Sequence, residues 1–231
     1  MRPFPLMLFA AGRGTRMGAL TADRPKPLIP VAGRPLIDHA LDLATAAGAH
    51  PVVVNLHYLG RQITGHLAGR EVLFSDESEA LLETGGGLRK ALPLLGPGPV
   101  LTLNSDAVWT GRNPLEQLAA AWEPGRMDAL LLLAPVAQAT GHSGTGDFLM
   151  DAAGRLRRAA GAPGLVYLGA QIIRTEGLYA IPEAAFSLNR LWDAMIAEGR
   201  VFGVVHQGGW CDVGRPEGIA VAEALLAGGG A

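Results

Sequence analysis

Cysteine is almost absent from this chain, which carries a single one, Cys211, among 231 residues. An internal disulfide is therefore excluded. Long apolar runs are missing too, since no uninterrupted apolar stretch reaches the roughly 20 residues that cross a bilayer. Arg2 and the apolar residues 4–11 faintly resemble a short signal peptide, but a glycine loop begins where cleavage would fall. We therefore expect a cytoplasmic protein with no membrane partner.

Neither sign of charge is in large excess, because 19 Lys and Arg stand against 21 Asp and Glu. The net charge of −2 implies no general attraction to nucleic acid. With 49% hydrophobic and 17% charged residues, the composition is typical of a globular protein. Internal repeats, low-complexity segments and linkers are not apparent. We expect residues 1–231 to form one domain, in a monomer or a small homo-oligomer.

Short apolar runs alternate with helical periodicity along the chain. The apolar runs predict strands at 4–9, 51–55, 71–74, 99–106, 129–134, 165–173 and 200–205. Helical spacing predicts helices at 36–47, 58–67, 115–122, 188–198 and 216–226. This alternation predicts an α/β protein whose mostly parallel sheet is covered by helices on both faces.

A glycine loop follows the first predicted strand and reads Phe9-Ala10-Ala11-Gly12-Arg13-Gly14-Thr15-Arg16-Met17-Gly18. Gly12 and Gly14 allow a tight turn and close approach to a ligand, and successive N–H groups in such a turn bind anions. Arg16 can fork onto phosphate oxygens, and Lys26 adds a compact charge. The combination predicts a polyphosphate site.

Two common glycine loops fit this sequence poorly. The dinucleotide-binding pattern requires a third glycine where Met17 stands, and the P-loop requires Gly-Lys-Ser/Thr, which this loop lacks. An ordinary strand-to-helix turn with an exposed arginine remains an alternative at this point.

The string Ala-Ala-Gly-x-Gly-Thr-Arg-Met, followed by Pro-Lys-Pro-Leu, resembles the signature of the sugar-1-phosphate nucleotidyltransferases. The resemblance implies a Rossmann-like three-layer sandwich with a mostly parallel mixed sheet, and a loop that wraps a nucleoside triphosphate. It implies that the nucleotide contacts Ala10, Ala11, Gly12, Gly14, Thr15, Arg16 and Lys26.

Two aspartates follow predicted buried segments and are candidate metal ligands. Asn104-Ser105-Asp106 resembles the family's first metal motif, and Trp210-Cys211-Asp212-Val213-Gly214 resembles its second. Alone, each aspartate is more typical of a turn or a helix cap. Mg²⁺ suits the pair, since it is typically bound through one or two carboxylates plus substrate phosphates. Cys211 is expected to be a buried apolar side chain, so we expect direct attack without a covalent enzyme intermediate.

The segment Leu82-Glu83-Thr84-Gly85-Gly86-Gly87 corresponds to the family's nucleobase-binding segment, so the resemblance places the base at Glu83, Thr84 and Gly85. Glu83 stands where many relatives have glycine. The segment resembles short bacterial members, which include N-acetylmuramate 1-phosphate uridylyltransferases and mannose-1-phosphate guanylyltransferases. The resemblance places the sugar at Asn104, Gly146, Asp147 and Gly169.

This chain departs from the family in two places. The Glu-Lys-Pro motif that contacts the sugar phosphate in other branches is missing from residues 157–163, which leaves Arg157 or Arg158 as a possible substitute. Arg215 stands where the family usually has threonine.

The prediction is Mg²⁺-dependent transfer of a nucleotidyl group, with UTP as the expected donor and N-acetylmuramate 1-phosphate as the expected acceptor. Arg16, Lys26 and Asp106 are the predicted catalytic residues. Alternatives are another hexose-1-phosphate nucleotidyltransferase, such as a mannose-1-phosphate guanylyltransferase, and a catalytically silent subunit that binds sugar nucleotide.

Overall fold

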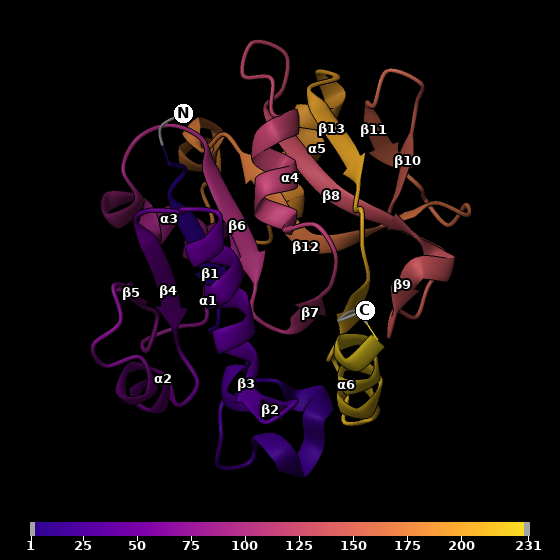
Figure 1. Ribbon diagram of the computed structural model, residues 1–231. Coiled ribbons are helices and arrows are strands. Elements are labelled where there is room, and N and C mark those ends of the chain that lie inside the picture. The colour runs from indigo at the N-terminus through magenta and orange to yellow at the C-terminus, as the bar shows by residue number, and fades with distance from the viewer. Residues whose placement is uncertain (1–2, 229–231) are drawn as a thin grey trace.

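The computed structural model describes residues 3–228, which contain a nine-stranded mixed sheet (Figure 1). Its main path runs through β11 (Leu156–Arg158), β10 (Phe148–Met150), β12 (Leu165–Ile173), β6 (Val100–Asn104), β1 (Leu6–Phe9), β4 (Val52–Leu56) and β5 (Leu73–Asp76). Off this path, β8 (Ala129–Pro135) pairs with β12 and with β13 (Val201–Val205).

The sheet divides into a parallel part and an antiparallel part. Strands β6, β1, β4 and β5 are parallel to one another. The long strand β12 runs antiparallel to β6 at its carboxyl end and to β8 along most of its length. The predicted α/β class is confirmed, and its parallel character holds from β5 to β6. Because parallel strands end at the same edge, the residues after β1 and β6 lie side by side.

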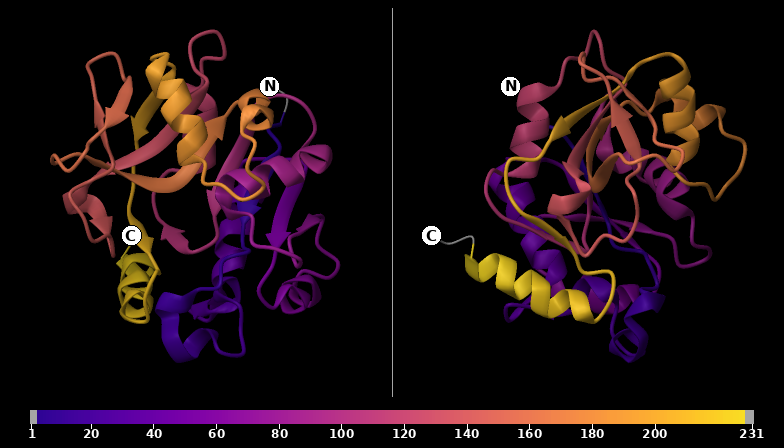
Figure 2. Two further views of the ribbon diagram at one scale, coloured as in Figure 1. Left: turned by 180° about the vertical axis from the view of Figure 1, so that it is seen from behind. Right: turned by 90° about the vertical axis from the view of Figure 1, so that its right-hand side faces the viewer.

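Helices cover both faces of the sheet, which gives three layers. One apolar cluster joins Leu6 and Leu8 of β1 to α1 (Leu36–Ala46) and α4 (Pro114–Ala121). The other joins Met7 of β1 to α3 (Glu83–Leu95) and α5 (Asn189–Ala197). Alternate side chains of a strand point to opposite faces, so each strand serves both clusters. Figure 1 shows α1 and α4 in front of the sheet, and the reverse view in Figure 2 brings α5 to the front.

A small second sheet closes the edge where β6 ends. It has the order β7 (Ala107–Trp109), β14 (Trp210–Asp212), β9 (Ala139–Thr140), with β14 antiparallel to β7 and parallel to β9. Asp212 pairs with Ala107, so this sheet brings β14 against the β6–β7 turn. The last helix, α6 (Glu217–Gly228), packs near the short hairpin of β2 (Pro30–Val31) and β3 (Arg34–Pro35).

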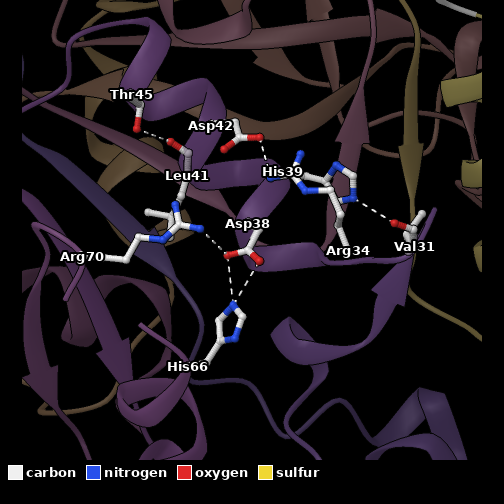
Figure 3. A network of polar contacts seen from close by, with 9 residues as sticks. All are labelled: Val31, Arg34, Asp38, His39, Leu41, Asp42, Thr45, His66 and Arg70. Atoms are coloured by element: carbon white, nitrogen blue, oxygen red, sulfur yellow. Dashed lines mark hydrogen bonds and ion pairs between the residues drawn. The ribbon is translucent and has the colours of Figure 1, made fainter. Parts of the chain in front are cut away.

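A buried carboxylate joins α1 to α2 (Gly60–His66), as Figure 3 shows. The Asp38 carboxylate is 3.0 Å and 3.1 Å from His66 Nε2 and accepts a hydrogen bond of 3.2 Å from Arg70 Nη2. On the same helix, Asp42 makes an exposed ion pair of 2.7 Å with Arg34. Asp38 thus links α1 to the segment around α2, whereas Asp42 forms only an exposed surface ion pair.

Most predicted elements are present with ends shifted by a few residues, but the helix α3 was missed. Three consecutive glycines and an internal proline hide its periodicity, since both residue types disfavour helices. The small strands β7, β9, β10, β11 and β14 were missed as well, because a strand of two or three residues carries no readable alternation. The structure also has four 3₁₀ segments, η1 (Thr15–Thr21), η2 (Lys26–Leu28), η3 (Val136–Gln138) and η4 (Glu176–Ala180). Within residues 3–228, we find no helix with the length and apolarity that a membrane crossing requires.

Candidate active site

The carboxyl ends of β1 and β6 border a cavity of about 410 Å³. Eight predicted site residues line it, namely Ala10, Ala11, Gly12, Lys26, Glu83, Thr84, Asn104 and Asp106. Asn104 and Asp106 line it from the β6 side, together with Ser105. Residues about 100 positions apart in sequence therefore meet because their strands are neighbours in the sheet.

Lys26 and Asp106 are in direct contact in this cavity. The Lys26 Nζ donates to Asp106 Oδ2 over 2.7 Å, and Lys26 is only 7% exposed. Gly14 makes room for the lysine, because a Cβ at this position would lie only 2.9 Å from Lys26 Cβ. The backbone of Gly14 also has a positive φ of +63°. Glycine adopts this conformation without strain, so Gly14 meets both demands of the turn.

Asp212 is brought to Asp106 by the pairing of β14 with β7, and Val213 N donates to the Asp106 carbonyl over 2.9 Å. Burial raises the pKa of Asp212 above its usual range, and the negative charge of Asp106 raises that pKa further. The charges of Lys26 and Arg16 act in the opposite direction. Two neighbouring carboxylates that repel each other are a suitable donor pair for a divalent cation.

Among residues 3–228, no group of three or more His, Cys, Asp or Glu side chains could hold a metal ion. The pairing of β14 with β7 places two carboxylates, those of Asp106 and Asp212, near each other. Such a set fits Mg²⁺ shared with substrate phosphates better than a metal held by protein ligands alone.

The glycine loop is positioned by a residue that the sequence analysis did not select, Asn55. Its Oδ1 accepts hydrogen bonds of 2.7 Å from Ala10 N and 3.3 Å from Ala11 N. Its Nδ2 donates to Glu77 Oε1 over 2.7 Å, and Asn55 and Glu77 are 3% and 1% exposed. The N–H groups of Ala10 and Ala11 are thereby occupied, so these two residues line the cavity without offering an anion-binding donor. The sequence offered one signal for this role, since Asn55 is a polar residue at the end of the apolar run 51–55.

The start of α3 forms another wall. Glu83 has a φ of +58°, a left-handed conformation that is strained for a residue with a side chain. Glycine adopts this conformation freely, which accounts physically for glycine at this place in the related segment. Thr84 Oγ1 accepts a hydrogen bond of 2.9 Å from Leu188 N and faces the cavity.

Gly85, predicted to contact the base, does not line the cavity. It is buried, its N–H donates to Phe186 O over 2.8 Å, and a Cβ there would lie 2.3 Å from the Phe186 ring. Gly87 is similarly constrained, since a Cβ would lie 2.6 Å from Glu77 Oε1. The glycines of this segment let α3 pack closely against its neighbours.

A second cavity of about 270 Å³ adjoins the first, with Phe9, Thr84, Asn104 and Ser187 lining both. Asp147 lines the second cavity, and its Oδ2 accepts a hydrogen bond of 2.8 Å from Tyr167 N. Gly146 and Gly169, predicted to contact the sugar, line neither cavity. Both have a positive φ, and a Cβ would meet the Gly164 backbone at Gly146 and the Asn104 side chain at Gly169. These constraints explain why both residues are glycine.

Arg16 lies in a third cavity of about 540 Å³, which Asp212 also lines. His142 from the glycine-rich loop 141–146 and Arg215 also line it. The structure therefore places Arg16 beside the second aspartate, and it gives Arg215 a position near Asp212. Thr15 is exposed at the start of η1 and lines none of these three cavities.

Cys211 is fully buried in β14. Burial, followed by the negative charge of Asp212, raises the pKa of its thiol to about 11. A protonated, inaccessible thiol is a poor nucleophile, in agreement with its expected packing role.

A strand–loop site at the carboxyl edge of a mixed sheet, with a lysine and two aspartates, is the arrangement of a nucleotidyltransferase. The model of the MobA-like NTP transferase domain matches residues 6–166, and the chain belongs to this family. The predicted resemblance to the short bacterial muramate group is confirmed as well. The chain is 44% identical to the N-acetylmuramate alpha-1-phosphate uridylyltransferase of Caulobacter vibrioides, over 96% of both chains.

A second relative agrees with this assignment, and a solved structure shares the fold. The protein of the same name from Neisseria meningitidis is 35% identical over 95% of this chain and 96% of its own. A Bacillus anthracis structure assigned as a glucose-1-phosphate thymidylyltransferase has a TM-score of 0.80 at 15% identity, covering 96% of this chain and 94% of that chain. At that identity, the structural likeness establishes the fold alone.

Proposed function

We propose that this protein transfers the uridylyl group of UTP to N-acetylmuramate 1-phosphate, releasing pyrophosphate. The observation that carries the proposal is the Lys26–Asp106 contact in a cavity large enough for a nucleotide, with Asp212 brought beside Asp106 from the neighbouring cavity that holds Arg16. The choice of UTP and of the acceptor comes from the two relatives that match nearly the whole chain.

In the proposed reaction, a phosphate oxygen of the sugar 1-phosphate attacks the α-phosphorus of UTP, and the bond to pyrophosphate breaks. Lys26 is held at the reacting centre by Asp106 and stabilises negative charge on the transferring phosphoryl group. Arg16, which lines the same cavity as Asp212, pairs with the triphosphate tail and the leaving pyrophosphate. The protein contributes positioning and charge and needs no covalent intermediate.

Asp106 and Asp212 are the residues that would hold Mg²⁺. When bound there, the ion polarises phosphoryl oxygens and offsets the charge of the triphosphate. Gly12 carries no side chain toward the cavity, which leaves room for the nucleotide over the loop. The base is proposed to lie along Glu83 and Thr84, and the sugar between Asn104 and Asp147.

The proposed setting is the cytoplasm, where UTP is available, with residues 1–231 acting as one domain in a monomer or small homo-oligomer. Neither nucleic acid nor a membrane is needed for the reaction.

The test is pyrophosphate release with Mg²⁺, crossing UTP, GTP and dTTP with the 1-phosphates of N-acetylmuramate, mannose, glucose and N-acetylglucosamine. Turnover that is highest with UTP and N-acetylmuramate 1-phosphate is the expected result. Preference for GTP and mannose 1-phosphate would replace the proposal by a guanylyltransferase. Binding of UTP without turnover of any acceptor would favour a silent nucleotide-binding subunit.

A further inference from the structure

The second cavity contains an arginine that the reaction described above does not use. Arg158 lines this cavity from β11, whereas Lys26 and Asp106 line only the first. The two cavities meet at Phe9, Thr84, Asn104 and Ser187. A sugar 1-phosphate that reaches the Lys26–Asp106 end with its phosphate therefore directs the opposite part of its ring toward Arg158.

Packing and hydrogen bonds fix the guanidinium of Arg158. Its centre lies 5.0 Å from the Phe148 ring centroid and 5.5 Å from that of Trp192. Its Nε donates to Asp193 Oδ1 over 2.8 Å, and its Nη2 donates to Asn189 O over 3.3 Å. These hydrogen bonds involve the edge of the guanidinium group that carries Nε and Nη2. Within residues 3–228, Nη1 has no hydrogen-bond partner, and such a preorganised donor suits a carboxylate.

A buried amide in the same cavity also lacks a partner. Gln171 is 0% exposed, and its Oε1 accepts a hydrogen bond of 2.9 Å from Trp192 Nε1. That bond assigns the other amide atom as Nε2, for which the described part of the chain provides no acceptor. An unsatisfied buried donor is energetically unfavourable, so a cavity with two unused donors is suited to a ligand rich in acceptors.

We propose that Arg158 determines acceptor specificity by binding the carboxylate of a sugar acid, with Asp193 as its positioning residue. The inference rests on the proposed function and extends it. N-acetylmuramate differs from N-acetylglucosamine by a lactyl ether, which adds a carboxylate remote from the anomeric phosphate. The phosphate, which all acceptors share, lies at the other end of the site. Arg158 therefore contacts the carboxylate that distinguishes N-acetylmuramate from the other acceptors.

The chain provides a matched control for this arginine. Arg157 precedes Arg158 on the same strand, is exposed and does not line the cavity, because adjacent residues of a strand point to opposite faces. Arg158→Gln and Arg157→Gln remove the same charge from the protein, so they separate a local contact from a general electrostatic effect.

The experiment measures kcat/KM with UTP for N-acetylmuramate 1-phosphate and N-acetylglucosamine 1-phosphate in the wild type and both variants. For Arg158→Gln, we expect a loss on the order of 10–100-fold with the muramate substrate, mainly in KM, because one charge-assisted contact is removed. With the glucosamine substrate, the change stays within about threefold, the range expected for a position that the smaller substrate does not touch. Arg157→Gln changes neither value.

Asp193→Asn is expected to lower the preference for muramate by less than Arg158→Gln does, since it loosens the guanidinium but leaves its charge. Equal losses with both substrates in Arg158→Gln would overturn the inference, as would an unchanged muramate KM. Thermal melting identifies variants that fail to fold, and Arg158→Lys, which keeps a charge on a stem of similar length, then takes the place of the glutamine variant.

Binding of free N-acetylmuramate and N-acetylglucosamine, measured by calorimetry, separates this inference from the proposed function. Preferential binding of N-acetylmuramate that Arg158→Gln removes supports the carboxylate contact even if no nucleotidyl transfer is observed. Turnover of N-acetylmuramate 1-phosphate with a preference that is insensitive to Arg158 leaves the proposed function standing and refutes the contact.

Discussion

Lys26 Nζ and Asp106 Oδ2 are 2.7 Å apart although 80 positions separate the two residues in sequence. The lysine comes from η2, just after the glycine loop, and the aspartate from the turn after β6. The side chain of Lys26 is 9% exposed and that of Asp106 is 31% exposed, and both line the first cavity. This arrangement makes the two residues one unit rather than independent charges.

Asp106→Asn is expected to lower kcat by more than about 100-fold while leaving the melting temperature within a few degrees of the wild type, because asparagine keeps the shape but loses the negative charge. The measurement is pyrophosphate release, with Mg²⁺ varied, beside thermal melting. A rate near that of the wild type would remove Asp106 from the proposed metal pair.

Lys26→Met should also lower kcat strongly, and the double variant Lys26→Met/Asp106→Asn should be no slower than the slower single variant. Residues that act as one unit have non-additive effects, since either change already disrupts the unit. Rate losses that multiply in the double variant would mean that the lysine and the aspartate act separately.

Alanine substitution of two glycines near the first cavity should affect different properties, stability at Gly85 and UTP binding at Gly12. Gly85→Ala places a Cβ 2.3 Å from the Phe186 ring, and we expect a loss of about 1–3 kcal/mol in the free energy of unfolding from overpacking. Gly12→Ala meets nothing within 4 Å, so stability is retained and the KM for UTP rises. Urea unfolding and steady-state kinetics on both variants make the comparison. A destabilised Gly12→Ala would show that the loop is packed more tightly than its open geometry indicates.

Asp38→Ala should reduce the free energy of unfolding by about 1–2 kcal/mol, because a largely buried carboxylate loses two partners that are themselves partly exposed. Asp42→Ala on the same helix removes an exposed ion pair and should leave stability unchanged within error (Figure 3). Neither residue lines the two cavities between β1 and α5, so kcat should be retained in both variants. Equal effects of the two changes on urea unfolding would contradict the structural role of Asp38.

Cys211→Ala should retain at least half of the wild-type kcat, and the native protein should not react with iodoacetamide. The thiol is fully buried and contacts backbone oxygens of β14 and α6, so it packs and does not react. Mass spectrometry before and after unfolding gives the reactivity. Inactivation by alanine together with labelling of the folded protein would require a covalent role for this cysteine.

Local patterns in the sequence determined the reaction class and most of the fold. The order of apolar strands and amphipathic helices is a property of neighbouring residues, so the α/β class could be predicted without the structure. The Ala-Ala-Gly-x-Gly-Thr-Arg-Met string with its lysine, and the two aspartates after buried segments, likewise lie within short stretches. Family membership, established by relatives that match nearly the whole chain, agrees with these patterns.

Only the tertiary structure decided which of these residues share a site and what the glycines do. The β7–β14 pairing that brings Asp212 to Asp106 joins strands of three residues, too short to leave a pattern. Residues distant in sequence pack closely against Gly85, Gly146 and Gly169. The sequence alone therefore could not show whether these glycines serve packing or contact a ligand. Asn55 and Arg158 are held by partners 22 to 45 positions away, and such contacts depend on the register of the sheet, which no local pattern encodes.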